Sequence, residues 1–391
     1  MSAGADHKPV LIVGGGIGGL TLALVLGRMA IPVVLLEQAD EFSEIGAGLQ
    51  LSANAARRLL ALDLETALNA KAAKPDCIHI QDGLTGQSLN KVPLGATALK
   101  RYGAPYWVMA RRDLQAVLLD AVQALPSVEI KTGQKFIDYQ QNETGVSAET
   151  TAGTKFDGAL LVGADGVWSR VRHMIAPDAA PQRTGFVAWR ALIEREAAPP
   201  LFSSPSTQAW LAPDAHVVAY RVSETQVNLV AVTKGAAQQR SWDEPLPKEQ
   251  LFEQLRPWHK PLRSAVMAVP EWRAWPLMML KPFQPWHKRR LMVMGDAAHA
   301  VVPFLAQGAA LAIEDAVALG NLIDQHRDEL HKVPALFQAQ RFRRCRRVFS
   351  KSVYNGQIYH ARGLSRLLRN FGLTHMPPAW LLKQYDWLYE A

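Results

Sequence analysis

The stretch of sequence that decides the fold reads Val10-Leu11-Ile12-Val13-Gly14-Gly15-Gly16-Ile17-Gly18-Gly19. Its four apolar residues at 10–13 predict a buried parallel strand, and the glycines that follow predict a tight turn. Residues 17–29 favour a buried helix, and a second apolar run at 33–36 follows Pro32 and ends at Glu37. The order of strand, glycine turn, helix, strand and acid predicts one βαβ unit.

Each part of this unit has a physical job in binding a dinucleotide. Gly14 permits the tight turn, Gly16 lets the backbone approach a pyrophosphate, and Gly19 lets the helix pack closely on the strand. The amino terminus of the helix offers unpaired N–H groups and a partial positive charge to phosphates. Glu37 is placed to bind a ribose hydroxyl pair. The unit does not choose between NAD and FAD, and the alternative is a glycine-rich turn without a ligand.

The same region has to be weighed as a targeting segment, because residues 10–27 carry no charge and follow Lys8. Five glycines within residues 14–19 would break a short membrane helix, so we expect a strand and turn there and no membrane association. Cys77 and Cys345 are too few for a disulfide framework and too scattered for a zinc site. They predict a reducing, cytoplasmic setting and no metal.

The charge pattern bears on the choice of partner. The net charge is +8, and much of the excess lies in the arginine-rich run at residues 341–347. A basic run can indicate nucleic acid binding. This run lies within a predicted helix, where a solvated or salt-bridged face is the better interpretation, so we expect no nucleic acid partner. A basic surface can also steer an anionic substrate towards the protein.

Three dispersed motifs carry a family resemblance. They are Gly14-x-Gly16-x-x-Gly19 with Glu37, Gly163-Ala164-Asp165-Gly166, and Gly295-Asp296-Ala297-Ala298-His299 with Pro303. Together they resemble the single-component FAD-dependent aromatic hydroxylases, the group of p-hydroxybenzoate hydroxylase. The segments 306–309, 313–316, 355–360 and 385–389 make the chain most similar to the branch of salicylate hydroxylase, 3-hydroxybenzoate 6-hydroxylase and 6-hydroxynicotinate 3-monooxygenase.

This resemblance implies an α/β fold, in which a Rossmann-like FAD-binding βαβ fold carries an inserted antiparallel-sheet substrate domain and is followed by C-terminal helices. A β-rich pattern at residues 186–232 and helical patterns at 334–360 and 364–389 agree with it. The implied domain limits are 1–75, 106–184 and 281–330 for the FAD-binding segments, 76–105 and 185–280 for the substrate domain, and 331–391 for the C-terminal helices.

The resemblance also implies cofactor contacts. Asp296 would bind the ribityl chain of FAD, and Arg111 would contact the flavin side. Asp165, with Gly166, would serve the phosphate region and NAD(P)H, whereas Pro303 and the backbone of Gln307, Gly308 and Ala309 would line the isoalloxazine ring. For Asp296 the alternative is a helix or loop cap. The sequence has no second glycine fingerprint for NAD(P)H, which fits this group, and does not decide between NADH and NADPH as co-substrate.

The implied reaction forms a flavin hydroperoxide from reduced FAD and O2, which then hydroxylates a small electron-rich aromatic acid, phenolic or hydroxypyridine. A histidine near the phenol can remove its proton and activate the ring. His216 and Tyr220 are four residues apart on a predicted strand and therefore share a face. We expect His216 as the base or as a hydrogen-bond partner of the substrate, with Tyr220 and Gln307 in the pocket. The alternatives are a structural histidine, a sheet tyrosine and a loop-holding amide. For His299 we favour a structural role.

Two departures from the family pattern leave the substrate open: Ala110 stands where the family often has histidine, and Arg221 where it often has proline. Competing functions are a monooxygenase of a lipid or quinone precursor, a flavin-dependent halogenase, and a non-catalytic FAD-binding sensor. Trp272-Arg273-Ala274-Trp275-Pro276 does not match the halogenase motif. A disulfide reductase would need a cysteine pair at the flavin. Whether hydroxylation is decarboxylative, and whether the protein is a homodimer, stay open.

Overall fold

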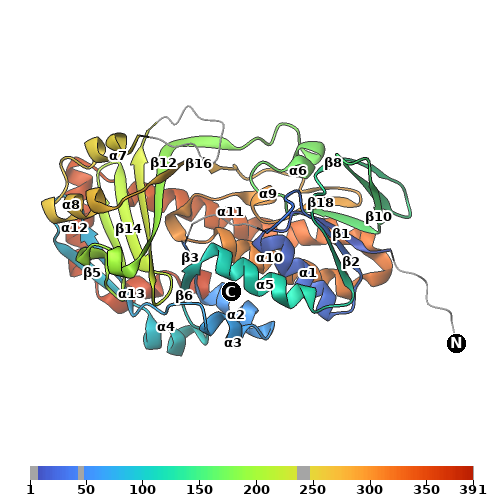
Figure 1. Ribbon diagram of the computed structural model, residues 1–391, viewed down its shortest axis with the longest axis horizontal. Coiled ribbons are helices and arrows are strands. Elements are labelled where there is room, and N and C mark those ends of the chain that lie inside the picture. The colour runs from blue at the N-terminus through green and yellow to red at the C-terminus, as the bar shows by residue number, and fades with distance from the viewer. Residues whose placement is uncertain (1–7, 43–47, 236–246, 391) are drawn as a thin grey trace.

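A computed structural model describes residues 8–42, 48–235 and 247–390 (Figure 1). The molecule is elongated, with the sheet that holds β1 and β2 at one end and the sheet that holds β12, β14 and β16 at the other (Figure 1). The long helix α11 (Val333–Tyr359) lies between the two ends. In the part of the chain that the structure describes, no helix has the length and apolar character needed to cross a membrane.

The amino-terminal sheet confirms the predicted βαβ unit. Within the described residues it has six strands in the order β17-β18-β11-β1-β2-β7, parallel except for the edge pair β17–β18. The bounds are β1 Val10–Val13, β2 Val33–Leu36, β7 Val128–Lys131, β11 Leu160–Gly163, β17 His287–Lys288 and β18 Leu291–Val293. β1, β11 and β18 are fully buried, as expected for continuous apolar runs covered on both faces.

Helices and two small sheets surround this core. α1 (Ile17–Arg28) crosses over from β1 to β2 and packs against α5 (Arg111–Gln123) and α10 (Gly308–Gln325). The other helices here are α2 Ala53–Ala61, α3 Glu65–Asn69, α4 Gly95–Tyr102, α6 Arg170–Ile175, α9 Asp296–His299, and the 3-10 turns η3 Pro303–Leu305 and η4 Arg327–Lys332. The small sheets pair β3 Gly48–Leu51 with β6 Trp107–Ala110, and β8 Phe136–Gln141 with β9 Val146–Thr150 and β10 Lys155–Gly158.

The second large sheet draws on two distant segments. Among the described residues it has seven strands in the order β16-β12-β15-β14-β13-β4-β5. The bounds are β4 Cys77–Asp82, β5 Ser88–Pro93, β12 Gln182–Glu194, β13 Thr207–Ala212, β14 Ala215–Arg221, β15 Gln226–Lys234 and β16 Arg273–Met279. The expected antiparallel pairing holds except between β4 and β13, which run parallel because a long crossover joins them. β12 begins before the predicted limit at residue 185, and the domain limits stay a prediction.

The two faces of this sheet have different neighbours. One face packs its buried tryptophans under η1 Arg195–Ala197, η2 Pro200–Phe202, α7 Lys248–Gln254 and α8 Lys260–Ala268. The other face joins the FAD-binding part through Tyr220, and through Val232 against Phe304. At the carboxy-terminal end, the helix predicted over 364–389 is divided into α12 Gly363–His375, α13 Pro378–Lys383 and α14 Asp386–Tyr389. Pro377 and Pro378 explain the break, because proline cannot continue a helix.

Candidate active site

A cavity of about 770 Å³ lies at the carboxyl ends of β1, β2, β11 and β18. This is where open α/β sheets bind their ligands, and the volume is in the range of cofactor pockets. The lining includes these residues predicted to hold the cofactor: Gly14, Gly16, Glu37, Arg111, Asp165, Asp296, Gly308 and Ala309. Of the predicted cofactor residues, Gly19 and Pro303 lie outside the lining. Six separate segments of the chain, those of residues 14–16, 37, 111, 165, 296 and 308–309, thus meet at one cavity.

The glycine turn leaves space where a phosphate would need it. Gly14 has φ +106°, and a Cβ built there would lie 2.5 Å from the carbonyl oxygen of Ala164. A Cβ on Gly19 would lie only 1.9 Å from the carbonyl oxygen of Gly14, which explains why helix α1 can pack so closely on the turn. A Cβ on Gly16 would have no atom within 4 Å in the part of the chain that the structure describes, and Gly16 caps α1 without a side-chain hydrogen bond. The first N–H groups of α1 are therefore available to an anion.

Glu37 closes the far side of this turn. Its Oε2 accepts the N–H of Gly15 at 2.7 Å and its Oε1 accepts the N–H of Ala39 at 2.9 Å. The carboxylate therefore fixes two loops that border the cavity as well as lining it. The bond to Gly15 is a second function for Glu37 that the sequence pattern did not predict, and its predicted contact with a ribose stays a proposal.

Asp165 lines the cavity, but its carboxylate oxygens accept hydrogen bonds from neighbouring protein groups. Its oxygens accept the hydroxyl of Ser169 at 2.5 Å and the N–H groups of Arg170 at 2.8 Å and Val171 at 3.1 Å. Burial raises the pKa of this carboxyl, although these hydrogen bonds oppose the effect. The side chain thus holds the first turn of α6, and a contact with FAD or NAD(P)H would come from the backbone at Gly166.

Asp296 and the start of α10 form the opposite end of the cavity. Gly295 ends the β18 segment with φ +59°, and Asp296 opens α9 directly after it. A Cβ built on Gly308 would lie 3.9 Å from Asp296 Oδ1, so the carboxylate faces the amino terminus of α10 across a glycine. A carboxylate beside helix N–H groups suits the hydroxyls of a ribityl chain. Together with the open glycine turn, these residues fit FAD.

Gln307 is buried in a polar network instead of pointing freely into the cavity. Its Oε1 accepts a hydrogen bond from Asn54 Nδ2 at 3.0 Å, and its Nε2 donates to Ser52 Oγ at 2.8 Å. Asn54 also donates to Glu314 Oε1 at 2.7 Å. These bonds support the loop-holding interpretation of this amide. Pro303 starts η3, which brings Phe304 against the substrate-domain sheet.

His216 and Tyr220 lie on one face of β14, the face turned towards the FAD-binding part. Tyr220 belongs to the core of that part, and the ring of His216 lies 5.5 Å from the ring of Phe304. Val217 and Ala219, between them, belong to the opposite core. Burial, and then the neighbouring His360, lower the pKa of His216 well below its usual value. Burial raises the pKa of Tyr220, so it stays protonated.

Some residues near this face were missed from the sequence. His216 Nδ1 lies 2.8 Å from Nε2 of His360, the C-cap residue directly after α11. The Tyr106 hydroxyl donates to Gln50 Oε1 at 2.6 Å, beside Tyr220. His360 lies in the segment 355–360, which contributed to the family resemblance, but no role was predicted for this histidine from the sequence. Tyr106 and Gln50 had no signal, because only the pairing of β3 with β6 brings them together.

The structure explains one of the two departures from the family pattern, Arg221, and gives no explanation for the alanine at position 110. Arg221 donates from Nε to the carbonyl of Ser203 at 3.1 Å, on the opposite face of β14 from Tyr220. It therefore points away from the face that carries His216. Ala110 is the buried last residue of β6 and caps the start of α5, directly before Arg111.

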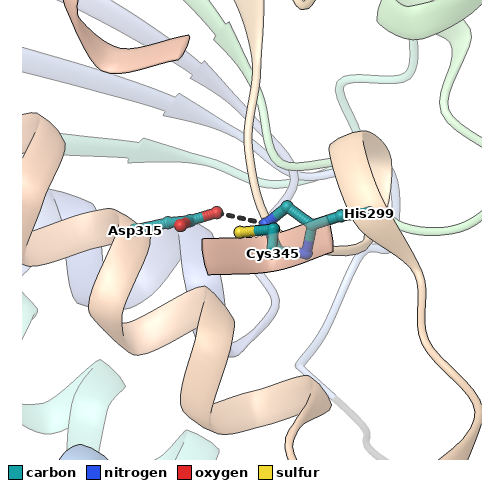
Figure 2. A group of neighbouring side chains, drawn as sticks. All are labelled: His299, Asp315 and Cys345. Carbon is teal, nitrogen blue, oxygen red and sulfur yellow. Dashed lines mark hydrogen bonds and ion pairs between the residues drawn. The ribbon is translucent and has the colours of Figure 1, made fainter. Parts of the chain in front are cut away.

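A buried cluster of His299, Asp315 and Cys345 (Figure 2) is hydrogen-bonded through Asp315 to Gly295, the residue before Asp296. Asp315 Oδ2 accepts from His299 Nε2 at 2.5 Å and from the N–H of Gly295 at 3.0 Å, and Oδ1 accepts from Arg341 Nε at 2.7 Å. These three ligand types could hold a metal ion, but a guanidinium, an imidazole and an amide already occupy the carboxylate. The cluster is therefore best described as a hydrogen-bonded support for the Gly295 turn, in line with the structural role expected for His299.

Comparisons with known proteins agree with this geometry. Residues 7–332 match the model of the FAD binding domain family. A 3-hydroxybenzoate 6-hydroxylase of Aquipseudomonas alcaligenes is 33% identical over 385 residues, 98% of each chain. A 6-hydroxynicotinate 3-monooxygenase of Bordetella bronchiseptica is 31% identical over 81% of this chain and 83% of its own. The structure of a salicylate hydroxylase substrate complex, 22% identical, superimposes with a TM-score of 0.83 over 99% of this chain and 96% of its own.

The motifs, the cavity and the comparisons converge on one family. The predicted resemblance and the predicted FAD cofactor are confirmed, since the family match covers most of the chain and two of the relatives align over nearly their whole length. The chain belongs to the FAD binding domain family and is an FAD-dependent monooxygenase of the aromatic hydroxylase group.

Proposed function

We propose that this enzyme hydroxylates a small aromatic acid that already carries a ring hydroxyl, a hydroxybenzoate or a hydroxypyridine carboxylate, with NADH or NADPH and O2. The observation that carries this proposal is the pair His216 and Tyr220, which faces the FAD-binding part beside the loop leading to Gly308. The named activities of relatives, 3-hydroxybenzoate 6-hydroxylase and 6-hydroxynicotinate 3-monooxygenase, support the substrate class.

The cofactor would be held along the whole cavity. The N–H groups at the start of α1 and the Glu37 carboxylate would bind its nucleotide half, and Asp296 would accept hydrogen bonds from the ribityl hydroxyls. The backbone at Gly308 and Ala309 would line the ring. When bound, reduced FAD supplies the activation of O2 that transfers one oxygen atom to an aromatic carbon. The protein contributes orientation and exclusion of water.

His216 would act as the general base towards the substrate hydroxyl. Burial and His360 keep its pKa below the usual value, so the imidazole is neutral at neutral pH and has a lone pair for the proton. A phenolate pushes electron density into the ring and makes its carbon more nucleophilic. Tyr220 stays protonated because burial raises its pKa, and its hydroxyl would donate a hydrogen bond to the substrate.

A substrate screen tests the proposed activity. Purified enzyme with FAD is offered hydroxybenzoates and hydroxypyridine carboxylates, and NADH and NADPH oxidation is followed while products are identified by mass. We expect at least one acid to stimulate oxidation and to gain one oxygen atom, with or without loss of CO2. A long-chain prenylated phenol serves as comparison. Stimulation by the prenylated phenol alone would contradict the proposed substrate class.

Replacing His216 tests its role. His216→Ala should lower the rate of hydroxylation by roughly 100- to 10,000-fold, the usual cost of losing a general base. Reduction of the flavin by NAD(P)H does not need the base, so the consumed reductant should appear as hydrogen peroxide. The measurement is hydroxylated product per NAD(P)H consumed, with exposed His375→Ala as the matched control and Tyr220→Phe as a milder variant. A normal product yield in His216→Ala would mean that another group accepts the hydroxyl proton of the substrate.

A further inference from the structure

The imidazole of His216 contacts a second histidine, His360. Its Nδ1 lies 2.8 Å from Nε2 of His360, and the two rings stack with centroids 5.1 Å apart and planes at 29°. Among the described residues, His360 is the one hydrogen-bond partner of the His216 ring. His216 is on β14 and His360 directly follows α11, so the pair joins two elements 144 residues apart.

Aromatic side chains surround the pair. Phe186 stacks on His360 with ring centroids 4.6 Å apart, and Phe304 lies edge-on to both imidazoles at 5.5 Å. Tyr359, the last residue of α11, also approaches His216. An imidazolium is costly in such an apolar environment, and burial lowers the pKa of His360 to about 4. A proton that reaches His216 therefore has to be passed on rather than kept.

The outer end of the pair lies near solvent. The backbone carbonyl of His360 accepts the N–H of Asp214, and the Asp214 carboxylate forms an ion pair with Arg362. The side chain of Arg362 is 57% exposed and that of Asp214 is 33% exposed, whereas His216 is only 4% exposed. The negative charge of Asp214 also acts on the His360 ring itself, so His360 lies between a buried imidazole and a charged group that water reaches.

We infer that His360 is a positioning residue for His216 that also receives its proton. This inference rests on the proposed function, in which His216 takes the hydroxyl proton of the substrate. If His360 Nε2 accepts the Nδ1–H of His216, then Nε2 of His216 carries the lone pair that a base needs. The hydrogen bond thereby selects the tautomer of His216 that is competent as a base.

The proton count of the transfer balances. The substrate O–H bond breaks as an N–H bond forms at His216 Nε2. The proton on His216 Nδ1 moves to His360 Nε2, and the proton on His360 Nδ1 leaves to solvent beside Asp214. Both rings stay neutral, in exchanged tautomers, and one proton has left the buried site. The reverse transfer, after oxygen is added, returns a proton to the product and restores both tautomers.

A purely structural pair would satisfy two buried rings without moving a proton. The two roles differ in what His360 variants do. His360→Phe keeps a flat ring against Phe186 but removes the acceptor. His360→Gln keeps an acceptor that can fix the tautomer of His216, yet it cannot relay the proton. A structural role predicts losses that follow stability, whereas the relay predicts losses in the proton-dependent step.

The experiment measures hydroxylation and flavin reduction separately in holoenzyme by rapid mixing, with FAD content and thermal midpoint as folding controls. We expect His360→Phe to lower hydroxylation by about tenfold to 100-fold, less than loss of the base itself, with flavin reduction unchanged. His360→Gln should fall between His360→Phe and the wild type. Imidazole added to a His360→Ala enzyme should restore part of the rate.

The pH profile gives an independent readout. The charged and titratable groups that face the pair are Asp214 before β14, Tyr359 on α11, and Arg362 and Arg369 at α12. Burial lowers the pKa of His216, and positive charge on His360 lowers it further, so an uncharged side chain at position 360 should raise that pKa. The acid limb of hydroxylation should therefore move to higher pH in His360→Phe and in His360→Gln.

The outcomes separate the inference from the proposed function. Normal hydroxylation and an unshifted pH profile in His360→Phe, together with a defective His216→Ala, would overturn the relay and leave the base in place. Normal hydroxylation in both His360→Phe and His216→Ala would show that His216 is not the base. If His360→Phe does not fold, His360→Gln and its pH profile decide, because an intermediate rate with a shifted acid limb supports the relay and a wild-type profile contradicts it.

Discussion

Gly16 and Gly19 belong to one glycine fingerprint but meet different surroundings, and a matched pair of substitutions separates them. Gly19→Ala places a Cβ 1.9 Å from a backbone oxygen, so the free energy of unfolding should fall by about 1–3 kcal/mol or more. The added methyl of Gly16→Ala meets no atom of the described residues within 4 Å, so the apoprotein should stay stable while FAD affinity falls. Urea unfolding of the apoprotein and FAD titration measure the two effects. Full FAD affinity in Gly16→Ala would place the pyrophosphate elsewhere.

Asp296 allows a second prediction for a single residue. Asp296→Ala removes a carboxylate that would accept ribityl hydroxyls, an interaction worth about 1.5–3 kcal/mol. The FAD dissociation constant should rise by about one to two decades, with the fold intact. Asp138→Ala, a change at an exposed aspartate on β8, is the control. An unchanged dissociation constant for Asp296→Ala would mean that the carboxylate caps α9 only.

Residues in local motifs were predictable, and residues joined by distant pairing were not. Gly14, Gly16 and Glu37 follow from spacing along 28 residues of chain, and each lines the cavity. The role of Gln307 was open, because only the fold brings Asn54 within 3.0 Å of its amide. The link from His216 to His360 spans 144 residues, and no periodicity in the sequence reports a contact of that kind.

At the scale of elements, α10 and α11 are joined by buried ion pairs that the sequence showed only as a basic run. Arg341 donates to Asp315 and Glu314 at 2.7 Å, and Arg344 also pairs with Glu314. Arg341→Met should lower the free energy of unfolding by about 3–5 kcal/mol, because it leaves buried carboxylates with fewer partners. Exposed Arg346→Met on the same helix should change it little, and denaturant unfolding compares the two. Equal effects of both variants would contradict this account.

These ion pairs also set an acid limit to stability. Burial alone would raise the pKa of Asp315, but His299 and Arg341 outweigh it and lower that pKa to about 2. Asp82 is the last residue of β4. Hydrogen bonds from Arg366 and Asn370 of α12 outweigh its burial and lower its pKa to about 2 as well. An unfolded aspartate has a pKa of about 3.9, so this stabilisation is complete above pH 4 and is lost as pH falls towards 2. Unfolding free energies between pH 5 and pH 2 should fall steeply, and less steeply in Arg341→Met.

At the scale of the molecule, one of the buried hydrophobic clusters joins the two ends. Tyr220 of the seven-stranded sheet and Val222, directly after β14, belong to the same buried cluster as Leu11 and Ile12 of the FAD-binding sheet. We therefore expect a single thermal transition, which FAD raises as a whole. At a free FAD concentration 100 times its dissociation constant, binding adds about 2.7 kcal/mol. Calorimetry with and without FAD measures this, and two transitions of which FAD moves only one would contradict it.

The sequence predicted the architecture at this scale better than its connections. Apolar runs at residues 10–13 and 33–36 indicated strands of one βαβ unit, and both lie side by side in one sheet. The parallel pairing of β4 with β13 had no local signal, because strand propensity does not encode a distant partner. The homodimer considered from the sequence stays a prediction.

The parallel pairing of β4 with β13 has a consequence for folding during translation. Asp82 ends β4, and its partner strand β13 is complete only at Ala212, 130 residues later. At about 5–20 residues per second, translation leaves the inner edge of β4 without its neighbour for roughly 6 to 26 s. An unpaired strand edge invites association with other chains. Newly made chains should therefore depend on chaperones through this interval, and slowing translation between codons 82 and 212 should lower the soluble yield of an otherwise stable enzyme.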